Sequence, residues 1–133
     1  MEAEPEQGTS SFPKNNKKIL IVDDDQTILH LLRRFFIGEG LEVLVAKDGL
    51  EAIGRLKTQR PAIVLTDLKM PGLPGGDLIR FIHQKMEGIP IIVMTAYPHL
   101  YPESRNGIEV DAYFRKPFDV NEMLSSIEKI LGG

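Results

Sequence analysis

A chain of 133 residues is long enough for one domain with a buried core, and its 42% hydrophobic and 26% charged residues are ordinary for a globular protein. The formal net charge of -3 gives no reason to expect nucleic acid or an anionic membrane as a partner, and no apolar stretch approaches the roughly 20 residues of a membrane helix. The sequence has no cysteine, which excludes disulfides, thiolate metal sites and a catalytic thiol.

The first 16 residues are polar and contain several glutamates, prolines and serines. Such a composition cannot bury enough surface to offset chain entropy, so we expect residues 1–16 to form a disordered tail. The same residues lack the apolar region of a signal peptide, which makes the cytoplasm the default location. One domain is expected to follow, from residue 17 to residue 131.

The folded part opens with the apolar run Ile19 to Val22, which predicts a strand covered on both faces. The run stops at three consecutive acids, residues 23–25. The apolar residues between 28 and 36 then have the spacing of one wide helical face, and Gly38 and Gly40 close that helix.

The middle of the chain repeats this order. We expect a strand over residues 41–46, and Asp48 is a good N-cap for a helix that runs to about Thr58. A third strand over residues 61–66 leads to Asp67, and a loop rich in proline and glycine follows it.

The last part of the chain begins with a predicted helix over residues 77–86, and a strand over residues 90–94 ends at Thr95. A short fifth strand over residues 111–114 leads to Lys116 and Pro117. Asp119 or Asn121 caps a final helix.

Strand and helix alternate five times along the chain. This alternation predicts an α/β fold, a doubly wound parallel sheet of five strands with helices on both faces, joined by right-handed crossovers.

In such a sheet the residues that follow the strands gather along one edge, so we expect Asp23, Asp24, Asp67, Thr95 and Lys116 to converge. Three carboxylates placed together repel one another and raise each other's pKa, and a divalent cation removes that conflict. Because the available ligands are oxygens, the fitting metal is Mg²⁺, with Mn²⁺ as the alternative.

A Mg²⁺ site of this kind usually keeps waters and takes one or two carboxylates plus a phosphate, which indicates phosphoryl transfer. In this interpretation Asp67 is the nucleophile that forms an aspartyl phosphate. Lys116 and the metal neutralise the phosphoryl oxygens, and the Thr95 hydroxyl hydrogen-bonds one of them.

Four pieces of the sequence resemble the response-regulator receiver domains (CheY-like) of two-component signalling. They are Ile-Val-Asp-Asp (21–24), Asp-Leu-Lys-Met-Pro-Gly (67–72), Met-Thr-Ala (94–96) and Asp-Ala-Tyr-Phe-Arg-Lys-Pro-Phe (111–118). They occur in family order and at family spacing, and together they span nearly all of residues 17–131.

The resemblance implies a flavodoxin-like (βα)5 fold with strand order 2-1-3-4-5. It implies that Asp67 is the phosphoacceptor, that Asp24 is a direct Mg²⁺ ligand, that Asp23 holds metal-bound waters, and that the backbone carbonyl of Lys69 completes the metal shell. Lys116 would bind the phosphoryl group.

The resemblance also implies a switch pair, in which the Thr95 hydroxyl moves to the phosphoryl group and the Tyr113 ring turns inward. Lys69 and Tyr97 lie at the two positions that tune hydrolysis, where the bulky Tyr97 would slow the attack of water. The family has a cis peptide bond before the proline that corresponds to Pro117.

A receiver domain implies a phosphorelay and a phosphohistidine donor, either a histidine kinase or a histidine phosphotransfer protein. It implies no enzyme activity beyond self-phosphorylation and autodephosphorylation. It also implies a homodimer through the fourth helix, fifth strand and fifth helix, and no contact with nucleic acid or membrane.

The chain departs from the family pattern between Thr95 and Asp111. Pro98 and Pro102 interrupt the segment that is normally the fourth helix, so we expect that helix to be short or irregular. The dimer surface uses this helix and is affected by the same departure. Gly76, in place of a usual apolar residue, is expected to loosen the start of the third helix.

Two other functions fit part of the pattern. A phosphatase with an aspartyl-phosphate intermediate would typically carry a second acid two residues after the nucleophile, where this chain has Lys69. A flavin- or nucleotide-binding module would need a loop rich in glycine, serine or threonine after the first strand, where this chain has three acids.

Overall fold

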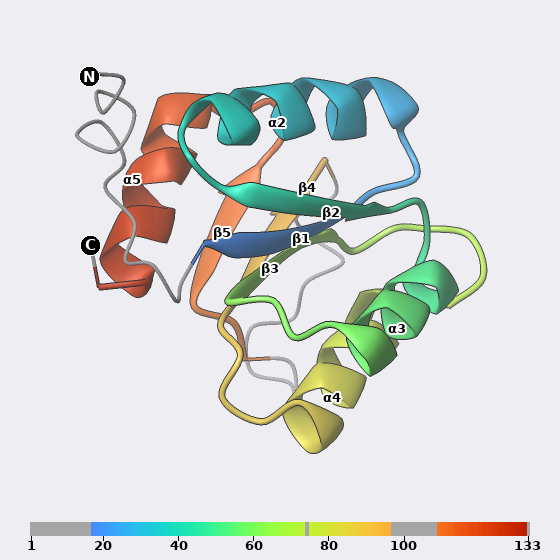
Figure 1. Ribbon diagram of the computed structural model, residues 1–133. Helices are drawn as coiled ribbons and strands as arrows, with labels where there is room; N and C mark the ends of the chain where they lie inside the picture. Colours follow the sequence, from blue (N-terminus) through green and yellow to red (C-terminus); the bar gives the residue numbers. More distant parts are fainter. Residues whose placement is uncertain (1–16, 74, 97–108, 133) are drawn as a thin grey trace.

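The computed structural model describes residues 17–73, 75–96 and 109–132. Within them, strand and helix alternate as far as the fourth strand, as expected from the sequence, and a fifth strand and a last helix follow after residues 97–108 (Figure 1). The elements are β1 (Lys18–Val22), α2 (Gln26–Gly38), β2 (Glu42–Ala46), α3 (Gly49–Thr58), β3 (Ile63–Asp67), α4 (Gly75–Lys85), β4 (Ile91–Thr95), β5 (Ala112–Arg115) and α5 (Val120–Ile130).

Several element boundaries differ by one or two residues from the sequence-based expectation, and two of these differences lie close to Asp67. β3 includes Asp67 itself, because the ladder with β4 continues to the pair Asp67 and Met94. α4 begins at Gly75, so the predicted loosening by Gly76 does not delay the helix start. The predicted short or irregular fourth helix falls within residues 97–108, outside the described residues.

The five strands form one parallel sheet in the order β2-β1-β3-β4-β5, which confirms the predicted fold class and strand order. β3 and β4 are buried along their whole length, and β1 is buried from Ile19 onward. These three strands are the ones whose sequences read as continuous apolar runs, because both of their faces are covered.

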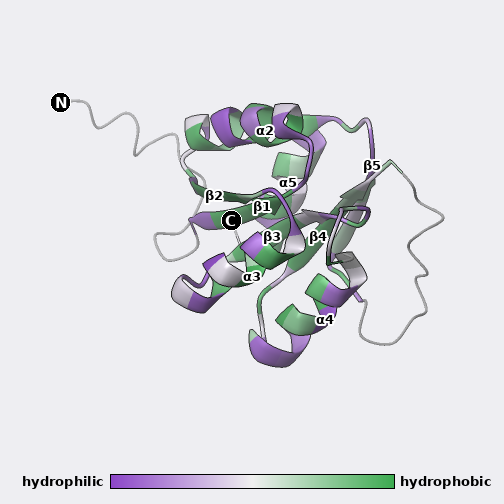
Figure 2. Cartoon of the chain, turned by 90° about the vertical axis from the view of Figure 1, so that its right-hand side faces the viewer, coloured by the Kyte–Doolittle hydropathy of each residue, from purple (hydrophilic) through white to green (hydrophobic). Residues whose placement is uncertain are grey.

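Helices cover the two faces of the sheet in pairs, with α2 and α5 on one face and α3 and α4 on the other (Figure 1). Each pair encloses its own apolar core. Alternate residues of β1 divide between them: Leu20 and Val22 belong to the core under α3 and α4, while Ile19 and Ile21 belong to the core under α2 and α5. The strands are accordingly apolar, while the helices are two-sided in hydropathy (Figure 2).

Three helices begin at an aspartate N-cap. Asp48 accepts from the backbone N–H of Glu51 at the start of α3, as predicted. Of the two candidates for the last helix, Asp119 is the cap, and it accepts from the N–H of Asn121. Asp25 caps α2, which fixes where the chain leaves β1.

No helix in the described part of the chain is long and apolar enough to cross a membrane.

Candidate functional site

The candidate site lies at the edge of the sheet where the parallel strands end. Asp23 directly follows β1, Asp67 and Thr95 are the last residues of β3 and β4, and Lys116 directly follows β5. Because all five strands point the same way, these four positions come to one edge, as the sequence pattern predicted.

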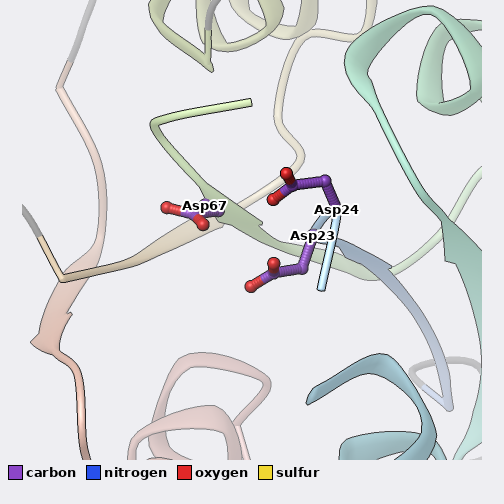
Figure 3. Close-up of side chains that lie close together, drawn as sticks. All are labelled: Asp23, Asp24 and Asp67. Carbon is purple, nitrogen blue, oxygen red and sulfur yellow. The ribbon is translucent and has the colours of Figure 1, made fainter. Parts of the chain in front are cut away.

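Three carboxylates gather at this edge. Asp23, Asp24 and Asp67 each offer one oxygen, and these oxygens lie within 4.8 Å of one another (Figure 3). Asp23 is fully buried and Asp67 is 6% exposed, whereas Asp24 is open to solvent. Two of the three acids are therefore withdrawn from water, which is costly without a positive partner.

Lys116 supplies part of that positive charge. Its Nζ donates to Asp23 Oδ2 at 2.7 Å and to Asp67 Oδ2 at 3.0 Å, so one ammonium bridges two carboxylates. The side chain of Lys116 is 14% exposed, so water screens these charge-assisted bonds only weakly.

The other oxygen of Asp67 is held by the backbone. Oδ1 accepts from the N–H of Leu68 at 2.7 Å and, more weakly, from the N–H of Lys69 at 3.3 Å. The carboxylate is thus oriented through both of its oxygens.

Burial raises the pKa of the Asp23 carboxyl above its usual range, and the charge of Asp67 adds to the increase. The hydrogen bonds from Lys116 and from the Asp25 backbone oppose this shift without cancelling it. Burial therefore still disfavours the ionised form of Asp23, even with the lysine in place.

Burial by itself would lower the pKa of Lys116, but the hydrogen bonds and charges of Asp23 and Asp67 outweigh burial and raise it. Lys116 therefore remains a cation over the physiological range, and the residual charge of the site is negative.

An open cleft of about 610 Å³ lies beside this cluster. Its lining consists of Asp23, Asp24, Asp25, Asp67, Lys69, Met70, Pro71, Ala96 and Lys116. Every acid of the cluster thus faces one space that is large enough for a cation and a phosphoryl group.

The remaining residues predicted from the sequence lie outside the acidic cluster and its cleft lining or fall outside the described residues. Thr95 is fully buried, and Ala96, the next residue, lines the cleft in its place. Tyr113 is half-buried on β5 and packs against the core under α3 and α4. The Lys116–Pro117 peptide bond is cis, the isomer expected from the resemblance. Tyr97 lies outside the described residues.

One functional contact was not predicted from the sequence. The backbone N–H of Asp25 donates to Asp23 Oδ1 at 2.9 Å. The Asp25 side chain is the N-cap of α2, but a capping role gives no indication that the peptide of the same residue orients a neighbouring acid.

The donor chemistry of the cluster fits a hard divalent cation. All three facing side chains are carboxylates, and oxygen ligands with one or two carboxylates are what Mg²⁺ takes in phosphate sites.

Residues 19–128 match the model of the response regulator receiver domain family. The chain is 38% identical to sporulation initiation phosphotransferase F of Bacillus subtilis over 118 residues, which cover 87% of this chain and 94% of that protein. It is 33% identical to the alkaline phosphatase synthesis transcriptional regulatory protein PhoP of the same organism, where 87% of this chain spans 49% of that protein.

Solved structures show the same architecture. The response regulator TrrA of Thermotoga maritima, solved in complex with Mg²⁺ and BeF, superposes with a TM-score of 0.79 at 33% identity, over 86% of this chain and 99% of that one. A CheY-like receiver domain protein of Methanospirillum hungatei gives a TM-score of 0.81 at 31% identity, over 87% and 94% of the two chains.

The two competing functions have little support at this site. The position two residues after Asp67 holds Lys69 on the cleft wall, so a phosphatase-like second acid is not there. The turn after β1 presents Asp23, Asp24 and Asp25 to the cleft, and these acids would repel the phosphate of a flavin or nucleotide.

Proposed function

This chain belongs to the response regulator receiver domain family, the phosphoacceptor modules of two-component phosphorelays, and we propose that Asp67 is its phosphoacceptor. The observation that carries this assignment is that Asp67 meets Asp23 and Asp24 within 4.8 Å and binds Lys116 at 3.0 Å. Asp67 is also the member of the cluster that the central strand β3 places at its end.

In the proposed reaction an oxygen of the Asp67 carboxylate attacks the phosphorus of a phosphohistidine. The new P–O bond forms as the P–N bond breaks, and the released imidazole takes up a proton. Water later hydrolyses the aspartyl phosphate, which restores the carboxylate and releases inorganic phosphate. Mg²⁺, or Mn²⁺ in its place, would neutralise charge on the phosphoryl oxygens.

The residues of this chain divide the remaining work. We assign Asp24 and Asp67 as direct metal ligands, the Lys69 carbonyl as a further oxygen ligand, and Asp23 as the acid that holds metal-bound waters. Lys116 already lies 3.0 Å from Asp67, so its ammonium is placed to bind the incoming phosphoryl group.

Thr95 and Tyr113 are proposed as the switch pair. Thr95 ends the strand next to Asp67, and Tyr113 pairs with Val93 two residues earlier on that strand. A change at the Thr95 hydroxyl can therefore reach the β5 edge through adjacent backbone. An altered Tyr113 ring signal on phosphorylation in NMR spectra, absent in Thr95→Val, would test the pair. The tuning roles of Lys69 and Tyr97 remain predictions from the resemblance.

The phosphodonor is proposed to be a histidine kinase or a histidine phosphotransfer protein, acting in the cytoplasm, where ATP loads such donors.

Further proposals are a receiver unit over residues 17–131 and a homodimer through the face that contains β5 and α5. Among the strands that the structure describes, β5 is at an edge of the sheet, and edge strands can pair with another chain. Sedimentation with and without a phosphoryl analogue would test the dimer.

The phosphoacceptor assignment is tested by incubating the protein with acetyl phosphate and Mg²⁺ and measuring its intact mass. The unsubstituted chain should gain the mass of one phosphoryl group, and Asp67→Asn should gain none. Asp77→Asn is the matched control, because Asp77 is an exposed acid whose carboxylate pairs with Arg80 on α4.

Two results would contradict the assignment. One is an unsubstituted chain that takes up no phosphoryl group in the presence of Mg²⁺. The other is an Asp67→Asn chain that is modified to the same extent as the Asp77→Asn control.

A further inference from the structure

Asp25 connects the start of α2 to the acidic cluster. Its side-chain Oδ1 accepts from the N–H of Thr27 at 2.9 Å and from the N–H of Ile28 at 3.4 Å, which makes it the N-cap of the helix. Its own backbone N–H points the other way and donates to Asp23 Oδ1 at 2.9 Å. Asp25 therefore satisfies N–H groups in the first turn of α2 with its side chain and binds the buried Asp23 with its backbone.

Both carboxylate oxygens of Asp23 accept hydrogen bonds from other residues. Oδ1 is held by the Asp25 peptide, and Oδ2 is held by Lys116 at 2.7 Å. Lys116 divides its ammonium between Asp23 and Asp67, whereas the Asp25 N–H is directed at Asp23. Because Asp23 is fully buried, it cannot replace a lost partner by turning toward bulk water.

We infer that Asp25 is a positioning residue for the metal site, because its capping side chain fixes the peptide that orients Asp23. Without the cap, residue 25 loses the bonds that keep it in the extended conformation seen at this helix start. Its N–H then turns away from Asp23, and the affinity of the cluster for Mg²⁺ falls. The inference rests on the proposed function, since it concerns Mg²⁺ affinity.

The alternative is that Asp25 matters only through its charge. Asp25 is exposed and lines the cleft, so its carboxylate also attracts cations from a distance. Capping and charge can be separated, because serine and asparagine are good N-caps without the charge, whereas alanine has neither property. Asp25→Ser, Asp25→Asn and Asp25→Ala all change the net charge by the same amount.

The experiment measures the Mg²⁺ dissociation constant of each protein by calorimetry, at low and at high KCl. Asp25→Ser and Asp25→Asn should share a small loss of affinity that shrinks at high salt, because salt screens an exposed charge. Asp25→Ala should bind a further roughly fivefold more weakly, the factor that corresponds to a lost cap, and this part should persist at high salt.

Amide hydrogen exchange of the metal-free proteins gives a second measurement that does not depend on binding. The Asp25 N–H should be protected in the unsubstituted chain and in the serine and asparagine variants, and it should exchange faster in Asp25→Ala. Asp25→Glu keeps the charge, but its longer side chain misplaces the carboxylate for the first turn. At high salt Asp25→Glu should bind Mg²⁺ as weakly as Asp25→Ala does. The glutamate variant therefore replaces the alanine variant in the test if Asp25→Ala does not fold.

The outcomes separate the two proposals. Equal dissociation constants for the serine and alanine variants, or unchanged exchange of the Asp25 N–H in a variant without a cap, would overturn the positioning role alone. An unsubstituted chain that binds no Mg²⁺ would overturn the proposed function and the inference with it.

Discussion

At the scale of single residues, Asp23 shows how the site differs from ordinary packing. Its carboxyl is fully buried, and its pKa is raised by that burial and by the nearby charge of Asp67. A carboxylate with these properties destabilises the metal-free fold when it is ionised, despite the hydrogen bond from Lys116. Its placement is explained by binding of a cation rather than by stability.

Asp23→Asn should therefore stabilise the metal-free protein at neutral pH, because it removes a buried charge while keeping an acceptor for Lys116. Mg²⁺ should raise the free energy of unfolding of the unsubstituted chain more than that of the variant. Urea unfolding in the presence of a chelator and of Mg²⁺ measures both effects. A variant less stable than the unsubstituted chain in the chelator would contradict this account.

The raised pKa of Asp23 also predicts the direction of a pH dependence. A carboxyl whose folded pKa lies above its unfolded value, taken as 3.8, contributes stability below the unfolded value and loses that contribution as the pH rises through the folded pKa. As the pH rises from below the unfolded pKa, the free energy of unfolding of the metal-free, unsubstituted chain should lose this contribution, and that of Asp23→Asn should not. Parallel pH profiles of the two proteins would contradict the raised pKa of Asp23.

At the scale of elements, the start of α3 packs closely against the loop that follows β3. Gly49, the first residue of α3, is buried, and a Cβ placed on it would lie 2.9 Å from Leu73 Cβ and Cδ2. Leu73 belongs to the loop between Asp67 and α4, which also contains Lys69. The absence of a side chain at Gly49 thus lets the loop after β3 pack against α3.

Gly49→Ala should lower the free energy of unfolding by about 1–3 kcal/mol, because the added methyl group overpacks this contact. Gly54→Ala is the matched control on the same helix, since a Cβ there meets nothing within 4 Å. The control should be more stable than the unsubstituted chain by about 0.5–1 kcal/mol, because alanine is the better helix former. Denaturant unfolding compares the two, and equal effects would show that Leu73 can move aside without cost.

At the scale of the whole molecule, the site depends on a parallel sheet whose strands are far apart in the sequence. Asp23 and Lys116 are 93 residues apart along the chain, yet Lys116 Nζ lies 2.7 Å from Asp23 Oδ2. Two apolar cores, one on each face, hold β1, β3 and β4 in register behind the cleft. In the part of the chain that the structure describes, both cores begin at Ile19 or later, so the proposed receiver unit over residues 17–131 includes them.

A chain that begins at Lys17 should therefore unfold at the same temperature as the full chain, within about 1 °C of experimental error, and should take up a phosphoryl group at the same rate. Thermal unfolding and mass measurement with acetyl phosphate check this expectation. A clearly lower midpoint would show that residues 1–16 contribute to the folded unit, contrary to the proposed boundary.

The sequence by itself determined the order of strands and helices, because continuous apolar runs, aspartate caps and glycine breaks are local signals. It also determined which residue types end each strand, and parallel strands bring such residues to one edge whatever the details of packing. Asp67, Asp24 and Lys116 could be predicted as a group for this reason, and the family resemblance supplied the strand order.

Only the tertiary structure decided how those groups meet. The bridge from one lysine to two acids, the full burial of Asp23 and the bond from the Asp25 peptide depend on the angle at which the chain leaves β1 and β5. The close approach of Gly49 and Leu73 is equally invisible in the sequence. Such contacts join segments whose separation is set by the packing of both cores, and no local pattern encodes a distance of that kind.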